Sequence, residues 1–155
     1  MFIKDYIPIL AELNIVTITV RILLAMICGG MIGYTRSKQG KEAGFRTHIL
    51  VCIGTAVAML TGEYAFLTNP KVDPTRIGAQ AISALGFLGA GSIIVSKNNE
   101  ISGLTTAAGL WAAATIGLAI GIGYYELAII GTVAILIAES ILKTVDTSKK
   151  KRKKH

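Results

Sequence analysis

The stretch 41–50, which reads KEAGFRTHIL, holds four ionisable side chains, and two of them stand directly before a long apolar run. A second stretch, GLTT at 103–106, also precedes an apolar run. We expect both stretches to open helices that begin on the same side of the molecule. Because helix N-termini carry partial positive charge, two of them side by side would favour an anion such as phosphate, a carboxylate or an acidic lipid.

An ordinary explanation of the same residues stays open. Arg46 could anchor to lipid phosphate, while Thr47 and Thr105 cap the two helices. His48 could sense pH, or it could be a common polar residue at a helix end. The polar residues that we group on this side, which we assign to the cytoplasm, are Arg36, Lys41, Arg46, Thr47, His48, Thr105 and Thr106.

Two charged residues lie inside apolar runs, where charge is expensive to bury. Arg21 is in the run 15–34 and Glu63 is in the run 49–67. Counted from the outer end, their depths agree within one helical turn, so we predict that they pair or share a polar cavity. Separate snorkelling to the interface is the alternative. The polar residues grouped on the outer side are Arg21, Glu63, Asp73, Arg76 and Gln80.

The stretch 73–80, DPTRIGAQ, opens an apolar run on that outer side. Asp73 can cap a helix, and Pro74 suits its first position. Gln80 falls one turn beyond Arg76, and a carboxylate with a nearby amide oxygen could hold a partly hydrated Mg²⁺. Asp73 is therefore the one candidate metal ligand, and we expect no cofactor other than Mg²⁺ as a ligand.

Other reactive residue types have ordinary explanations. Cys28 and Cys52 lie within apolar runs and form no C-x-x-C, so we expect buried thiols without a metal or redox role. Glu139 and Lys143, four residues apart, are predicted to form a local helix pair. The sequence has no nucleophile–base pair, no H-E-x-x-H and no phosphate-binding Gly-rich loop, so we expect no enzymatic activity.

The elements that position these residues are predicted to be membrane-spanning helices. The 155 residues are 52% hydrophobic with a mean hydropathy of +0.60, and only 16% are charged, against about 25% in soluble domains. Five segments approach the roughly 20 apolar residues that span a bilayer, at 15–34, 49–67, 77–95, 104–122 and 125–142. The predicted fold is all-α, a polytopic transmembrane helical bundle.

Lys and Arg are distributed unevenly between the two sides of this bundle. Twelve fall on the side of the C-terminus, including the run KKKRKK at 149–154, and four fall on the other. The positive-inside rule then places the N-terminus outside and the C-terminus in the cytoplasm. Next to apolar spans the basic run is better explained by attraction to anionic lipid than by nucleic acid. We divide the chain into an interfacial segment 1–14, a transmembrane domain 15–142 and a basic cytoplasmic tail 143–155.

Small residues recur through the predicted spans. Such stripes let helix backbones approach closely, and one of them could also support a homo-oligomer. Helix breaks that line a pore are the alternative. Trp111 lies too deep for an interfacial anchor, so we expect it to be packed between helices with its indole N–H bonded. The predicted packing residues are Gly29, Gly33, Gly86, Gly89, Gly91, Gly109, Ala113, Gly117, Gly121 and Trp111.

Four motifs in order resemble the membrane domain of the MgtC/SapB family. They are RILLAMICGGMIGYTR, KEAGFRTHILV, DPTRIGAQAISALGFLGAG and GLTTAAGLWAAATIG, and together they cover about residues 21–123. Residues that match the family pattern are Lys41, Gly44, Arg46, Thr47, Asp73, Pro74, Arg76, Gln80, Gly86, Gly89, Gly91, Thr105, Thr106 and Trp111.

The resemblance implies a multi-pass protein of the bacterial inner membrane, tied to growth in low magnesium, acid stress and survival inside host cells. Family members are labelled magnesium transporters, and some resemble regulators that act on membrane partners such as the F-type ATP synthase. It therefore implies either a modulator of magnesium or proton-motive homeostasis with a membrane protein partner, or an ion transporter.

Two departures from the family pattern bear on these expectations. The family usually reads G-x-E-R where residues 33–36 read GYTR, so Thr35 stands in place of a carboxylate that could balance Arg36 or Arg46. Longer members carry a soluble domain after the last span, whereas only a basic tail follows here. We therefore expect the chain to resemble the short, SapB-like members.

Overall fold

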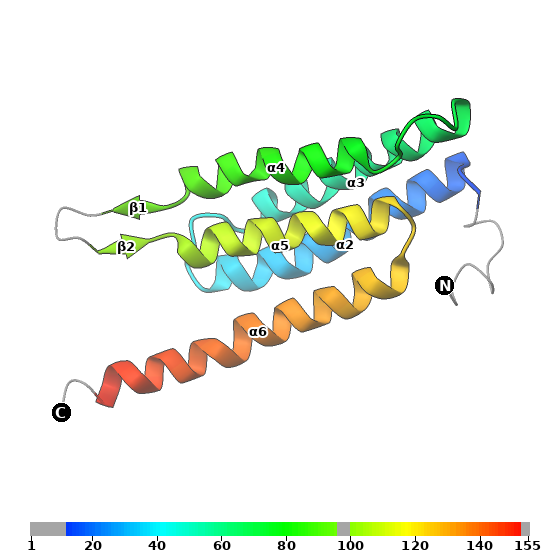
Figure 1. Cartoon of the computed structure of the whole chain (residues 1–155). Helices are drawn as coiled ribbons and strands as arrows, with labels where there is room; N and C mark the ends of the chain where they lie inside the picture. The colour runs from blue at the N-terminus through cyan, green and yellow to red at the C-terminus, as the bar shows by residue number, and fades with distance from the viewer. Residues whose placement is uncertain (1–11, 96–99, 153–155) are drawn as a thin grey trace.

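Five helices run up and down along a common direction in the part of the chain that the computed structural model describes, residues 12–95 and 100–152, with side chains to residue 140 (Figure 1). Their bounds are Ile15–Lys38 (α2), Phe45–Thr68 (α3), Arg76–Gly91 (α4), Leu104–Gly121 (α5) and Tyr125–Arg152 (α6). Helices suit lipid because each satisfies its own backbone hydrogen bonds. The prediction of an all-α bundle is confirmed at this level.

Three of the helices are long and apolar enough to cross a membrane, namely α2, α3 and α5. The 16 residues of α4 cover about 24 Å at 1.5 Å per residue, less than a hydrocarbon core of about 30 Å. Most of the apolar part of α6 is described, but its side chains beyond residue 140 are not. The count of five spans and the orientation of the bundle stay predictions, as does the interfacial segment 1–14, most of which lies outside the described residues.

A short antiparallel hairpin corrects the end of the third predicted span. The helix ends at Gly91, and Ile94–Val95 (β1) pairs with Ile101–Ser102 (β2). The chain then turns into α5 at Gly103, whose φ is 86° and where a Cβ would overlap the carbonyl of Ser92. Only glycine tolerates both conditions. The hairpin projects from one end of the bundle, which we call the hairpin end; the last turns of α6 extend in the same direction (Figure 1).

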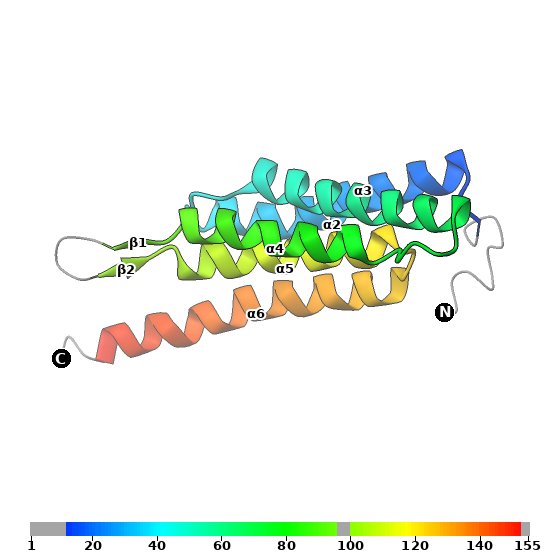
Figure 2. The ribbon, with the colours of Figure 1, turned by 45° about the horizontal axis from the view of Figure 1, so that its top comes forward.

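The helix α5 is at the centre of the bundle. It packs against α2, α3, α4 and α6, whereas α4 and α6 lie on opposite sides of it (Figure 2). The core of the bundle around α5 is built from small and branched apolar side chains. The buried core residues are Ala25, Cys28, Ile32, Cys52, Ala56, Ala113, Ile116, Ala119, Ile120 and Ala128.

Glycines bring the central helices into backbone contact. A Cβ at Gly33 of α2 would lie 2.7 Å from the Cα of Phe45 in α3, and one at Gly29 would lie 2.9 Å from Cys52 Cβ. Where α5 meets α3, a Cβ at Gly117 would overlap Thr55 and Cys52, and one at Gly121 would lie 2.7 Å from the carbonyl oxygen of Ala56. The predicted stripes therefore serve close packing at these positions.

Other residues predicted to pack between helices do not. A Cβ added at Gly86 or Gly91 of α4 would have no atom of the described residues within 4 Å, whereas one at Gly89 would lie 3.6 Å from Ala107. The prediction for Trp111 is wrong, because 52% of this residue is exposed on the outside of α5. Depth along a helix could be counted from the sequence, but the direction in which each face points could not.

The glycine contacts generate a stability prediction. Gly117→Ala should lower the free energy of unfolding by about 1–3 kcal/mol, since the added methyl overlaps backbone and must push α5 from α3. Gly86→Ala is the matched control, because its methyl enters open space and Ala favours a helix by up to about 1 kcal/mol. Unfolding of both variants in detergent micelles, followed by circular dichroism, measures the difference. Equal stabilities would show that this close contact does not hold the bundle together.

Candidate functional site

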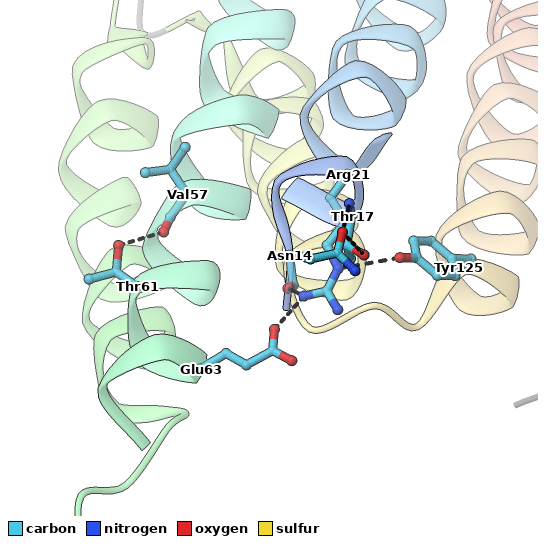
Figure 3. Close-up of polar contacts among 8 residues, drawn as sticks. Asn14, Thr17, Arg21, Val57, Thr61, Glu63 and Tyr125 are labelled. Carbon is cyan, nitrogen blue, oxygen red and sulfur yellow. Dashed lines mark hydrogen bonds and ion pairs between the residues drawn. The ribbon is translucent and has the colours of Figure 1, made fainter. Parts of the chain in front are cut away.

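A buried arginine joins four helices at the end of the bundle away from the hairpin. Arg21 is fully buried. Its Nη1 donates to the Glu63 carboxylate and, at 2.6 Å, to the carbonyl of Gly121, while its Nε donates to the Tyr125 hydroxyl at 3.3 Å. Figure 3 shows the guanidinium between Glu63 and Tyr125. We call Arg21, Glu63, Tyr125 and the Gly121 carbonyl the Arg21 cluster.

The ends of several helices place these groups. Asn14 caps α2 by accepting from the backbone N–H of Thr17 at 2.9 Å. Arg21 lies about one helical turn after Thr17. Tyr125 is the first residue of α6, brought close by the turn at Gly123, whose φ is 77°. The predicted contact between Arg21 and Glu63 is confirmed. Tyr125 and the Gly121 carbonyl could not be predicted as partners of Arg21, because neither carries a charge that stands out in the sequence.

The other predicted members of the outer group lie outside this cluster. Asp73, Arg76 and Gln80 are all exposed. Asp73 accepts from the backbone N–H of Thr75 at 2.8 Å and from its hydroxyl at 2.7 Å, and these hydrogen bonds lower the pKa of the Asp73 carboxyl. Helix α4 begins at Arg76 rather than beside Asp73, so the aspartate caps the preceding turn.

No group of three His, Cys, Asp or Glu side chains that could hold a metal ion occurs among the residues described. One oxygen of Asp73, Oδ1, already accepts both hydrogen bonds from Thr75. Mg²⁺ at Asp73 therefore stays a prediction that rests on this single exposed carboxylate.

A second buried arginine organises the hairpin end. Arg36 is 4% exposed, its Nη2 donates to the Thr106 hydroxyl at 3.2 Å, and its Nε lies 3.7 Å from Oε1 of Glu139. The Thr35 hydroxyl donates to the other carboxylate oxygen of Glu139 at 2.6 Å. Together with His48, these residues form what we call the Arg36 cluster: Thr35, Arg36, His48, Thr106 and Glu139.

The imidazole of His48 is fully buried in this cluster, so the expectation of an ordinary polar residue at a helix end is wrong. Its Nδ1 lies 2.9 Å from the carbonyl oxygen of Gly44, and its Nε2 has no hydrogen-bond partner among the described atoms. The early turns of α3 pack against Gly29 and Gly33, which carries the ring inward. The backbone approach of two helices thus determines where this titratable group lies.

The remaining residues of the predicted cytoplasmic group stay outside the buried cluster. Lys41, Arg46, Thr47 and Thr105 are exposed at the hairpin end. Capping by the two threonines is wrong, since α3 and α5 begin one or two residues earlier and are capped by Gly44 and Gly103, without a side-chain hydrogen bond. An anion held at these exposed helix ends stays a prediction.

Glu139 makes contacts with another helix that its sequence context did not predict. We expected a local pair with Lys143, whose side chain lies outside the described residues. Instead Glu139 reaches from α6 to Thr35 and Arg36 of α2. Thr35 stands where the resemblance led us to expect a carboxylate, and α6 supplies one to the same arginine. The departure at Thr35, taken together with the isolated Glu139, was the available signal.

Comparisons with known proteins agree with the motifs. A family model described as the MgtC family matches residues 22–148. The "Putative magnesium transporter YhiD" of Escherichia coli (strain K12) is 46% identical over 123 residues, which cover 76% of this chain and 57% of the relative. Protein MgtC of Salmonella typhimurium (strain LT2) is 40% identical over 122 residues, covering 79% of this chain and 51% of the relative.

The chain therefore spans about half the length of the curated relatives it matches. An uncharacterized protein of Synechocystis shows the same proportion, with 37% identity over 82% of this chain and 53% of its own length. No solved structure matches the chain. What the whole relatives do is thus a matter of proposal for this chain.

The Arg21 cluster generates a second stability prediction. Glu63→Gln should lower the free energy of unfolding by about 1–2 kcal/mol, because it removes the only carboxylate among the described partners of a buried guanidinium. The value is below that of a fully buried pair, since the Glu63 side chain is 23% exposed. Asp73→Asn, at an exposed carboxylate of the same end, should cost less. Unfolding in micelles tests both, and an equal effect would contradict a structural role for the Arg21–Glu63 contact.

Proposed function

This chain belongs to the MgtC family, and on that basis we propose that it is a non-enzymatic protein of the bacterial inner membrane that modulates magnesium or proton-motive homeostasis. Membership of the family and three apolar helices make it a membrane protein. Modulation here means action on the membrane and on partner helices, without transport of an ion through the bundle. Modulation is favoured over transport by one observation, the close packing in the middle of the helical bundle.

Close packing fills the region between the two polar clusters. Cys28, Cys52, Ala56 and Ala113, in the middle of the bundle, are between 0% and 4% exposed. Gly117 presses directly on the backbone of α3, so no side chain of α5 holds the two helices apart there. An ion path would need polar groups that replace its hydration through this region. The polar side chains described in this region, Thr55 and Thr132, are buried and donate to backbone carbonyls of their own helices, so they form no continuous polar path. This supports modulation over transport.

We place the hairpin end in the cytoplasm. Exposed Lys41 and Arg46 lie at this end, and α6 runs toward it and enters the basic run 149–154 in its last turn. Positive charge on the cytoplasmic side and attraction to anionic lipid support this orientation. The lipid bilayer is then the first partner of the protein.

We also propose that the protein self-associates through the outer face of α4. Only Gly78, Leu85 and Gly89 of its 16 residues are buried. Gln80 is exposed and Phe87 is 85% exposed, while Gly86 and Gly91 are open among the described residues. An amide facing lipid gains from a partner, and open glycines permit close approach of a second copy of this helix.

Transport of Mg²⁺ or another ion is the alternative, favoured by the name of the Escherichia coli relative, a putative magnesium transporter. In proteoliposomes that enclose a Mg²⁺-sensitive dye, we expect no Mg²⁺ entry above that of protein-free liposomes, because the middle of the bundle is closed. Entry that is abolished by Asp73→Ala or Arg46→Ala would overturn the proposal. Circular dichroism of both variants checks that any loss of entry does not come from unfolding.

Self-association has its own test. Gly91→Cys should form a disulfide-linked dimer on mild oxidation in membranes, because the two copies of α4 would meet at this face. Gly54→Cys on α3 is the matched control, since Gly54 is equally open among the described residues. The native Cys28 and Cys52 are buried and should contribute little. Equal cross-linking at both positions, or none at Gly91→Cys, would contradict the assignment to α4.

A further inference from the structure

Three polar atoms from three helices converge beside Gly109 of α5. A Cβ at Gly109 would lie 3.4 Å from Nε2 of His48, 3.6 Å from Oε1 of Glu139 and 3.7 Å from Nε of Arg36. His48 and Arg36 are 0% and 4% exposed, and the Glu139 side chain is 11% exposed. Because Gly109 has no side chain, no Cβ stands between the backbone of α5 and these three atoms.

Each of the three atoms has a defined hydrogen-bonding role. The Gly44 carbonyl can only accept, so Nδ1 of His48 carries the hydrogen and donates to it. In the neutral ring Nε2 then holds a lone pair and accepts. The Nε of Arg36 is a donor, and Oε1 of Glu139 is an acceptor. Both Nε2 and Nε lack a hydrogen-bond partner among the described atoms.

One water molecule matches this set of atoms. It can accept from Arg36 Nε–H and donate to His48 Nε2 and Glu139 Oε1, which gives the three hydrogen bonds typical of a buried water. It would remove the penalty of leaving the buried Nε2 and Nε atoms unsatisfied. A free anion would meet the carboxylate and the lone pair of Nε2, and a metal cation would meet the guanidinium of Arg36.

We propose that the space beside Gly109 binds one water molecule and that His48, linked through it to Glu139, is a proton-binding site. A proton from the solution adds to the lone pair of Nε2, and the imidazolium then donates to the water. The carboxylate of Glu139 is its counter-ion, while Arg36 keeps its ion contact with the same carboxylate. The charge of the cluster rises from zero to +1, and no other bond is made or broken.

The charged surroundings of His48 come from two neighbouring helices. Arg36 faces it from α2 and Glu139 faces it from α6. Helix α5 presents Gly109 and Thr106, which do not titrate, and the charged residue of α4, Arg76, lies near the opposite end. Lys143 follows Glu139 by one turn of α6, with its side chain outside the described residues. Protonation therefore depends on the balance between one guanidinium and one carboxylate.

This inference does not rest on the proposed function, since the site binds its proton whether the protein modulates or transports. Nuclear magnetic resonance of ¹⁵N-labelled histidine in lipid bilayers tests it. His155→Gln leaves His48 as the only histidine. We expect the Nδ1–H tautomer at high pH and protonation at Nε2 as the pH falls. The Nε2–H tautomer at high pH would overturn the proposal.

Glu139→Gln, added to the His155→Gln protein, tests the counter-ion. It keeps an oxygen for the Thr35 hydroxyl but removes the charge that stabilises the imidazolium. The pH at which half of His48 is protonated should fall by about 1 unit, because an opposite charge within about 4–6 Å shifts a titration by 1–3 units. Asp73→Asn, at the other end of the bundle, is the control and should leave this pH unchanged. An unchanged pH in Glu139→Gln would overturn the proposal.

Gly109→Ala tests the water. Its methyl fits at 3.4 Å or more from the neighbouring atoms but occupies the place of the water. We expect magnetisation transfer from water to His48 Nε2 in the parent protein and in a Gly86→Ala control, and its loss in Gly109→Ala. Circular dichroism checks that the variant keeps its helices. Transfer that persists in Gly109→Ala, or is absent from the parent, would overturn the assignment of a water to this space.

Discussion

A guanidinium buried in an apolar bundle must find its partners inside the protein, and two arginines impose this constraint here. Arg21 contacts groups from α3, α5 and the start of α6, and Arg36 contacts groups from α5 and α6. Both contacts need helices that lie close together, because side chains such as the Thr106 hydroxyl are short. The glycines of α2 and α5 provide this closeness by bringing the backbones of α2, α3 and α5 together. Helix α6 is fastened at two levels, through Tyr125 and Glu139.

The same packing separates the two ends of the molecule. Polar groups gather around Arg21 at one end and around Arg36 at the other, and small apolar side chains fill the layer between them. Lipid can solvate the outside of such a bundle, but water has no continuous polar lining to follow through its middle, because the Thr55 and Thr132 hydroxyls there bond to their own helices. The proposal of a modulator rather than a conduit rests on this layer. Chemistry is then confined to the two ends, where titratable and charged groups could respond to solution, lipid or a partner helix.

Hydropathy and the polar, Gly- or Pro-containing joints between apolar runs were enough to predict the helices, since each observed helix begins within four residues of its predicted start. Equal depth in neighbouring antiparallel spans was enough to predict the contact of Arg21 with Glu63. The contact of Arg36 with Glu139 could not be found in this way, because it depends on the rotation of α6 about its axis. The outward direction of Trp111 depends on rotation as well, and so do the open glycines of α4. The burial of His48 depends on how closely α3 approaches α2, which the positions of the glycines suggest but do not measure.

The central claim is that the layer between the Arg21 cluster and the Arg36 cluster is closed to water. Two native cysteines report on it directly, because Cys28 and Cys52 both lie in this layer and are 4% and 0% exposed. A small charged thiol reagent, added to folded protein in sealed vesicles from either side and followed by mass spectrometry, measures whether water reaches them. The account predicts that neither thiol is modified until the protein is unfolded in detergent. Rapid modification of Cys52 in the folded protein, from one side or from both, would show a water path through the bundle and contradict the account.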